Sequence, residues 1–313
     1  MERINKAFQI LSIGFLFFTN LIYSSVSVNS HKADIVIFSF DRPLQLFALL
    51  ESLEKHVIGL DGIHVLYRSS SSEYDLAYNE CFTFFKKLNI SCSKQGSNPR
   101  EDFKPLTLSI LNSIKNNYLL FAVDDIIVKE PINLSECIGH MIATKAHGFY
   151  LRLGQNIVKC YTEGIDTPVP PCTEVIPGVY TWTFKDGKGD WGYPSTMDMT
   201  VYSKEEVLSV FPYLAFSSPN LLEGAWATRA GGLAGGPAID MQKKGLFYTN
   251  SKIFNIPMNL VQTDHLIAKN MSIPVSKLLT LFNEGFKVNI DSYSKINNQA
   301  PHMEAELYLT KRV

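Results

Sequence analysis

The stretch Tyr118-Leu-Leu-Phe-Ala-Val-Asp-Asp125 decides the fold, because an uninterrupted apolar run leads straight into two carboxylates. An apolar run of this length is typical of a strand buried on both faces of a parallel sheet. In such sheets the ligand site lies in the crevice beyond the carboxyl ends of the strands. The sequence therefore predicts a ligand site at Asp124 and Asp125.

The rest of the first half alternates strand-like runs with helix-like faces, which predicts a parallel α/β sheet with right-handed crossovers. The expected strands are 34–40, 62–67 and 90–93, and the expected helices are 43–53, 74–88 and 105–114. The second half has shorter expected strands, separated by a Pro-rich loop and a loop of Gly, Asp and aromatic residues. We therefore expect a mostly parallel central sheet flanked by helices, with a mixed C-terminal region. Because no linker is evident, residues 31–313 are expected to form a single domain.

The first thirty residues have the layout of a secretory signal peptide or a signal anchor. Arg3 and Lys6 precede an apolar run from Phe8 to Tyr23, and small polar residues follow. That run has roughly 16 residues, whereas about 20 span a bilayer comfortably, so an anchor requires extension through Val28. Because the positive charge precedes the run, the body is expected to face away from the cytosol. A buried core helix and retention on the cytosolic face of a membrane are the alternatives.

The composition excludes several classes of protein. Hydrophobic residues make up 46% and charged residues 19%, which excludes a disordered chain. The net charge is −1, so no nucleic acid partner is expected. Five cysteines are too few for a disulfide scaffold. In an exported body, Asn89, Asn133 and Asn270 would become glycosylation sequons, and Cys160 and Cys172 could bridge, although free cysteines are favoured.

The adjacent carboxylates of Asp124 and Asp125 indicate a bound cation. Two neighbouring acids at the end of a buried strand repel each other and are costly to bury without a positive charge. A divalent ion with oxygen ligands, Mn²⁺ or Mg²⁺, would offset that cost. An ordinary turn is the alternative, since Asp is common after strands.

Two strand ends resemble glycosyltransferase family 2-like enzymes of the GT-A fold, a Rossmann-like architecture. Ser39-Phe-Asp-Arg-Pro43 resembles their first strand end, and Phe121-Ala-Val-Asp-Asp125 resembles their DxD motif in its xDD form. The resemblance covers residues 34–265 and implies a glycosyltransferase that uses a nucleotide-sugar donor and a glycan, lipid or protein acceptor. One departure is Val123, which stands where the family's first acid would be.

The resemblance also implies roles for individual residues. Asp125 would ligate the metal, and Asp124 would face the ribose or the sugar of the donor. The remaining donor-binding candidates are Ser39, Asp41, Arg42, Arg68 and Asn259. His265, in a late Asp-His pair, is a candidate for an extra metal ligand.

An inverting enzyme of this kind also needs a base for the acceptor hydroxyl. Glu223, in a segment that resembles the family's acidic motif at a helix start, is the first candidate, and a solvated helix-start Glu is its alternative. Asp190 is the rival base, because its neighbours Trp191 and Tyr193 are suited to stacking on a sugar or to plain packing.

Two other functions remain open at this point. A sugar-phosphate nucleotidyltransferase shares such a sheet but carries a Gly-rich loop after the first strand, where this chain has Phe40-Asp-Arg-Pro43. A catalytically inactive, exported carbohydrate-binding protein would agree with the export signal, because nucleotide sugars are absent outside cells.

Overall fold

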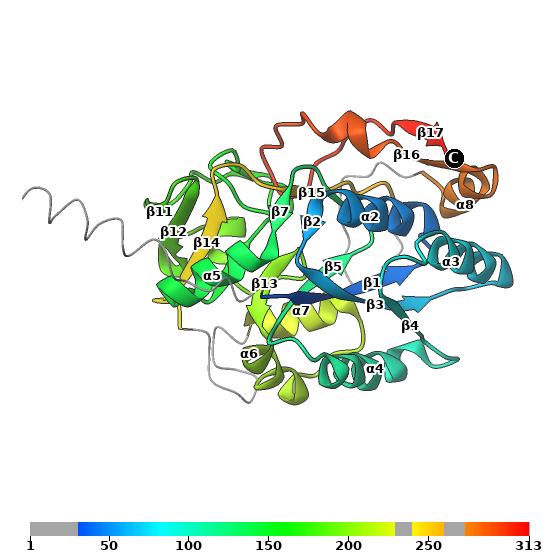
Figure 1. Cartoon of the computed structure of the whole chain (residues 1–313), viewed down its shortest axis with the longest axis horizontal. Coiled ribbons are helices and arrows are strands. Elements are labelled where there is room, and N and C mark those ends of the chain that lie inside the picture. The colour runs from blue at the N-terminus through cyan, green and yellow to red at the C-terminus, as the bar shows by residue number, and fades with distance from the viewer. Residues whose placement is uncertain (1–30, 229–239, 260–272, 313) are drawn as a thin grey trace, which may run out of the picture. The chain divides into compact units, whose positions relative to one another are not determined.

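The structure, a computed structural model, describes residues 31–228, 240–259 and 273–312. Residues from Lys32 onward form one compact unit, drawn in Figure 1. Its α-helices are α2 (Pro43–His56), α3 (Ser72–Phe84), α4 (Pro99–Ser113), α5 (Leu134–Thr144), α6 (Lys204–Leu208), α7 (Pro219–Thr228) and α8 (Val275–Asn283). Short 3-10 helices are η1 (Phe184–Asp186), η2 (Gly189–Gly192), η3 (Phe211–Tyr213) and η5 (Ile290–Tyr293).

Nine of the strands form one sheet, in the order β11-β12-β14-β8-β13-β5-β1-β3-β4. These strands are β1 (Ala33–Phe40), β3 (Leu60–Arg68), β4 (Ile90–Lys94), β5 (Tyr118–Val123), β8 (Gly148–Tyr150), β11 (Cys172–Ile176), β12 (Val179–Thr183), β13 (Thr200–Ser203) and β14 (Lys244–Tyr248). The remaining strands pair in twos: β2 (Val57–Ile58) with β7 (Ile132–Asn133), β6 (Ile126–Val128) with β15 (Ile253–Asn255), β9 (Lys159–Cys160) with β10 (Ile165–Asp166), and β16 (Phe286–Val288) with β17 (Leu309–Lys311).

The nine-stranded sheet has two halves of different kinds. Strands β5, β1, β3 and β4 form a parallel half. The mixed half begins at β13, which runs antiparallel to both β5 and β8, and continues through β14 to the antiparallel strands β12 and β11. This arrangement confirms the predicted α/β fold with a mostly parallel core and a mixed C-terminal region.

Helices cover both faces of the parallel half, as Figure 1 shows. Ile35 and Ile37 of β1 pack into a core shared with α2, α3 and α8. Their neighbours Val36 and Phe38 pack into a second core shared with α4 and α7. Since side chains alternate between the faces of a strand, covering both faces requires the continuous apolar run seen in the sequence.

A third core of large aromatic side chains stabilises the mixed half. It includes Tyr150, Trp182, Phe184, Trp191 and Phe247. The indole of Trp182 donates to the Trp191 carbonyl at 3.0 Å, and the indole of Trp191 donates to the Ile157 carbonyl at 3.1 Å. Trp191 is fully buried, so the alternative of plain packing describes it, rather than stacking on a sugar.

Some local predictions were wrong. Helix α4 begins at Pro99, six residues before the expected start, and holds Pro105 in its interior. Strand β11 occupies part of the expected Pro-rich loop, and β14 was not predicted at all. In β14 a side chain at Gly245 would lie 2.4 Å from the Trp182 ring, so glycine is required where β-branched residues usually signal a strand.

Several predictions fall outside the described residues. They are the N-terminal segment 1–30, the sequon at Asn270 and the candidate ligand His265. Within the described ranges, no helix is both long and apolar enough to cross a membrane. The five cysteines, all of them described, are free thiols.

Candidate functional site

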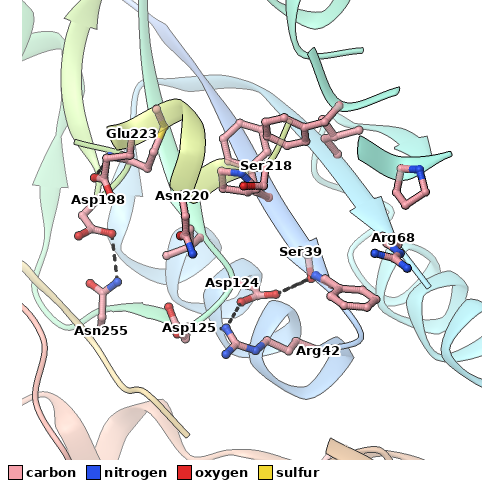
Figure 2. A pocket seen from close by; sticks show the side chains of 18 of the residues that line it. Ser39, Arg42, Arg68, Asp124, Asp125, Asp198, Ser218, Asn220, Glu223 and Asn255 are labelled. Carbon is pink, nitrogen blue, oxygen red and sulfur yellow. Dashed lines mark hydrogen bonds and ion pairs between the residues drawn. The ribbon is translucent and has the colours of Figure 1, made fainter. Parts of the chain in front are cut away.

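A pocket of about 410 Å³ lies at the carboxyl ends of β1, β3 and β5. Figure 2 labels side chains from the parallel half, such as Ser39 and Asp124, and others from later segments, such as Asp198 and Glu223. The parallel half, with α4, contributes Phe38, Ser39, Phe40, Arg42, Leu66, Arg68, Gln95, Pro99, Arg100, Phe103, Val123, Asp124 and Asp125. Segments after it contribute Thr162, Met197, Asp198, Ser217, Ser218, Pro219, Asn220, Glu223, Asn255, Pro257, Asn259 and His302.

An arginine, Arg42, bridges the two adjacent carboxylates. Its Nη1 lies 2.9 Å from Asp124 Oδ1 and 3.2 Å from Asp125 Oδ2. The Ser39 hydroxyl donates to Asp124 Oδ2 at 2.7 Å, and the Phe40 amide donates to the same oxygen at 3.3 Å. The charge repulsion that indicated a metal is therefore offset, at least in part, by a residue of the chain itself.

The loop between β1 and α2 holds Arg42 in place. Asp41 has a φ of 51°, in the left-handed region, which turns the chain sharply after the strand. Its carboxylate accepts from the Ser70 amide at 2.8 Å, so it fixes the loop after β3 and does not line the pocket, contrary to its predicted role with the donor. The Arg42 amide donates to the Tyr78 hydroxyl at 3.0 Å, and Arg42 Nη2 donates to the Asn259 carbonyl.

The paired carboxylates keep one oxygen for a ligand. Burial raises the pKa of Asp124 to about 6, although Arg42 opposes this shift. Asp125 Oδ1 is buried and has no hydrogen-bond partner. Over the described ranges, no cluster of three or more His, Cys, Asp or Glu side chains could hold a metal ion. Mg²⁺ often binds one or two carboxylates together with substrate phosphates, so the orphan oxygen of Asp125 fits such an ion.

Two other predicted donor residues line this part of the pocket. The Arg68 guanidinium lies over the Phe40 ring, 4.5 Å from its centroid. Asn259 accepts from Gln45 Nε2 at 3.1 Å, while its own Nδ2 is buried without a partner. Both residues therefore present polar groups where the sequence predicted contacts with a donor.

Glu223, in the first half of α7, is a half-buried acid of the pocket. Burial raises its pKa to about 7, and the negative charge of Asp198 adds to the shift. The Met197 amide donates to Glu223 Oε1 at 2.8 Å, which holds the side chain in a fixed orientation. A carboxyl group that takes and releases a proton near neutral pH is suited to general acid–base catalysis.

Asp190, the rival base, lies elsewhere. Its carboxylate forms an ion pair at 2.5 Å with Arg152, which is 1% exposed, and it does not line the pocket. Arg152 Nη2 also donates to the carbonyls of Asp190 and Tyr193. The structure thus corrects this prediction: Asp190 neutralises a buried arginine and orders the aromatic loop.

Asp198, Asn255 and His302 are among the polar residues of the pocket that the sequence reasoning missed. Only Asp198 carried a signal, because it is a lone acid between two methionines just before a strand. Asn255 and His302 come from separate segments that no local pattern links.

Comparisons with known proteins agree with the strand-end motifs. No family model matches the chain. The bifunctional glycosyltransferase pgtA of Dictyostelium discoideum is 26% identical over 194 residues, 56% of this chain. The chain spans about a quarter, 24%, of the length of that relative. This relative confirms the resemblance to glycosyltransferases.

Two solved structures show a weaker similarity. The crystal structure of S. aureus TarS 1-349 in complex with UDP is 15% identical, with a TM-score of 0.44, and the match covers 69% of this chain and 60% of that one. The complex of the same TarS fragment with UDP-GlcNAc is 14% identical, with a TM-score of 0.43, and covers 80% and 66%.

Proposed function

We propose that this chain is a glycosyltransferase that moves a sugar from a nucleotide-sugar donor to an acceptor hydroxyl, with inversion. The observation that carries the proposal is one pocket that joins the Arg42-bridged carboxylates of Asp124 and Asp125 to Glu223, a half-buried acid with a pKa of about 7. The similarity to a glycosyltransferase supports the same reaction class.

The donor binds at the parallel half. Its nucleoside lies toward Phe40 and Arg68, and its diphosphate lies near Arg42 and Asp125. A divalent ion, Mn²⁺ or Mg²⁺, held by Asp125 Oδ1 would offset the charge that develops on the leaving diphosphate. The free Nδ2 of Asn259 is placed to donate to the donor from the opposite loop.

The acceptor hydroxyl loses its proton to Glu223. In Figure 2, Asp124 and Asp125 lie between Glu223 and Arg68. In this proposal an acceptor at Glu223 approaches the sugar from the side away from the diphosphate, as inversion requires. Deprotonated Glu223 takes the proton as the new glycosidic bond forms, and the nucleoside diphosphate leaves with the bonding electrons.

Residues 1–30 direct the catalytic unit into or across a membrane in this proposal, with a Golgi-type lumen as its location in a eukaryotic cell. The charged start and apolar run from Phe8 to Tyr23 support it. A lumenal location would also bring a glycan, lipid or protein acceptor together with a nucleotide sugar.

A thermal-shift panel of UDP-, GDP- and CMP-sugars, with and without Mn²⁺, tests the function. A ligand at 100 times its Kd stabilises the native state by about 2.7 kcal/mol, so one nucleotide class should raise the melting temperature by several degrees. The same donor should release its nucleoside diphosphate when acceptor is added. If free sugars shift the melting temperature and no nucleotide sugar does, the chain is a carbohydrate-binding protein.

A further inference from the structure

Asp198, Asn255 and His302, which the proposed donor site does not use, gather at one end of the pocket. Figure 2 shows Asp198, Asn255 and Glu223 together, with Arg68 at the other end and Arg42 in between. Asn255 Nδ2 donates to Asp198 Oδ1 at 3.1 Å. His302 Nε2 lies 3.6 Å from the other carboxylate oxygen, Asp198 Oδ2. Asn255 therefore holds one oxygen of Asp198, and His302, from a distant part of the chain, faces the other.

Chain pairing brings His302 to this place. The Asn255 amide donates to the Pro301 carbonyl at 2.8 Å, and the Met303 amide donates to the Asn255 carbonyl at 3.1 Å. These two bonds fix His302 beside the last residue of β15. The arrangement is built from backbone contacts, so it does not depend on the side chains that face the pocket.

Asp198 is fixed by a strained neighbour. Met199 has a φ of 42°, in the left-handed region that side chains rarely adopt. Its amide donates to the Phe121 carbonyl at 2.8 Å, which ties this turn to β5. Strain of this kind persists where the surrounding structure enforces it, often at functional sites.

One atom of this group lacks a partner. Asn255 is 1% exposed and lines the pocket, and its Oδ1 accepts no hydrogen bond. A buried carbonyl oxygen without a partner costs about 1–3 kcal/mol, so a ligand that donates a hydrogen bond would relieve that cost. A hydroxyl group of an acceptor is such a donor.

The charges at this end select against anions. Asp198 and Glu223 are both acids, and the charge of Arg152, which reaches both of them, is already paired with Asp190. The two guanidinium groups labelled in Figure 2, Arg42 and Arg68, lie toward the donor end. A phosphate or carboxylate here would face like charges, which is a common device for rejecting wrong partners.

We propose that Asp198, Asn255 and His302 form the acceptor subsite, and that it takes an uncharged, hydroxyl-bearing glycoside and rejects an anionic one. The proposal rests on the proposed function, since it assigns the acceptor of that reaction. His302 acts as a positioning residue that keeps Asp198 aimed at the acceptor.

The test uses matched acceptors and three variants. The acceptors are the p-nitrophenyl glucoside, galactoside and mannoside, with the corresponding glucuronide and galacturonide. The variants are Asp198→Asn, His302→Ala and, as control, Asp166→Asn in the exposed β9–β10 hairpin. Diphosphate release from the donor that the thermal-shift panel identifies gives the KM of each acceptor, and calorimetry gives the Kd of the nucleoside diphosphate.

At least one neutral hexoside should be a substrate, and its matched uronide should be used about 100-fold less well. Hydrogen bonds to charged groups contribute about 1.5–3 kcal/mol, so Asp198→Asn should raise the acceptor KM about 10- to 100-fold. His302→Ala should raise the same KM by a smaller factor, about 10-fold on the same scale. Neither variant should change the nucleotide Kd, and Asp166→Asn should match the wild type in both quantities.

Equal use of a hexoside and its uronide would overturn the proposal, and so would a panel in which no neutral hexoside is used. An unchanged KM in a folded His302→Ala protein would contradict it even if Asp198→Asn does not fold. Failure of the wild type to bind any nucleotide would appear in the calorimetry instead, and would remove the proposed function itself.

Discussion

Each half of the sheet holds a buried arginine paired with carboxylate, but only one of the two faces the pocket. In the parallel half Arg42 bridges Asp124 and Asp125, and an oxygen of Asp125 remains without a partner. In the mixed half Arg152 pairs with Asp190, away from the pocket lining. The same ion-pair chemistry serves ligand binding in one place and packing in the other, so burial and charge alone do not identify a site.

The largest effect is expected from replacing Arg42 or Arg152. These two substitutions should separate the role in ligand binding from the role in packing. Removing one partner of a buried ion pair typically costs 3–5 kcal/mol, so Arg42→Met and Arg152→Met should each lower the free energy of unfolding by about that amount. Only Arg42→Met should also abolish nucleotide binding. Urea unfolding and calorimetry below the unfolding transition measure the two quantities.

The comparison breaks down if Arg152→Met, in a sample shown to be folded, loses nucleotide binding while Arg42→Met retains it. That result would move the donor site to the mixed half and return Asp190 to the list of catalytic candidates.

Glu223→Gln tests the acid that α7 brings to the pocket. General-base assistance is typically worth about 10²- to 10⁴-fold in rate, so transfer should fall by that factor while the nucleotide Kd stays constant. Glu205→Gln on the exposed face of α6 is the matched control and should leave the rate unchanged.

Asp190→Asn completes this comparison of two acids. It should lower the melting temperature, because Arg152 loses its charged partner, and leave the rate per folded molecule near that of wild type. A rate loss in Asp190→Asn together with a normal Glu223→Gln enzyme would exchange the two roles.

The titration of Glu223 should give a smaller effect, a pH dependence of stability and activity with a defined sign. Burial raises the pKa of Glu223 from 4.5 to about 7, so between these pH values the folded state holds a proton that the unfolded state has lost. The free energy of unfolding should therefore fall as pH rises through this window, by up to about 1.4 kcal/mol per pH unit. Activity should change in the opposite sense and rise toward pH 7 as the base loses its proton.

Urea unfolding curves and kcat/KM, both measured from pH 4.5 to 8, check this pair of trends. Glu223→Gln is the reference, and its stability should fall less, because Glu223 no longer titrates while Asp124, whose pKa is also raised, still does. Identical pH profiles of stability in wild type and Glu223→Gln would show that Glu223 does not titrate in this range.

The sequence could predict which residues of the parallel half gather at one edge, because strand order and apolar runs place them. Ser39, Arg42, Asp124 and Asp125 lie at or just after the carboxyl ends of strands that meet there. The ion pair itself could not be predicted, since side-chain spacing says nothing about which cation lies between two acids. The ion pair of Arg42 offsets repulsion between Asp124 and Asp125 that the sequence reasoning had assigned to a bound metal.

The mixed half of the site was harder to predict, for a physical reason. Asp198 depends on the backbone turn at Met199, and His302 depends on pairing between β15 and a segment about fifty residues later. Such long-range pairing leaves no periodic signal in the sequence. Asp190 was misread because its aromatic neighbours suggest a sugar site as readily as a core.

The central claim is that Asp125 and the pocket around it bind the diphosphate of a nucleotide together with a divalent ion. Calorimetric titration of the wild type and of Asp125→Ala with UDP and GDP, each in Mn²⁺ and in EDTA, tests this claim most directly. The account predicts that the wild type binds one nucleotide in Mn²⁺ and much more weakly in EDTA, and that folded Asp125→Ala loses the Mn²⁺-dependent part. Equal binding by both proteins, or binding that EDTA does not weaken, would contradict the account.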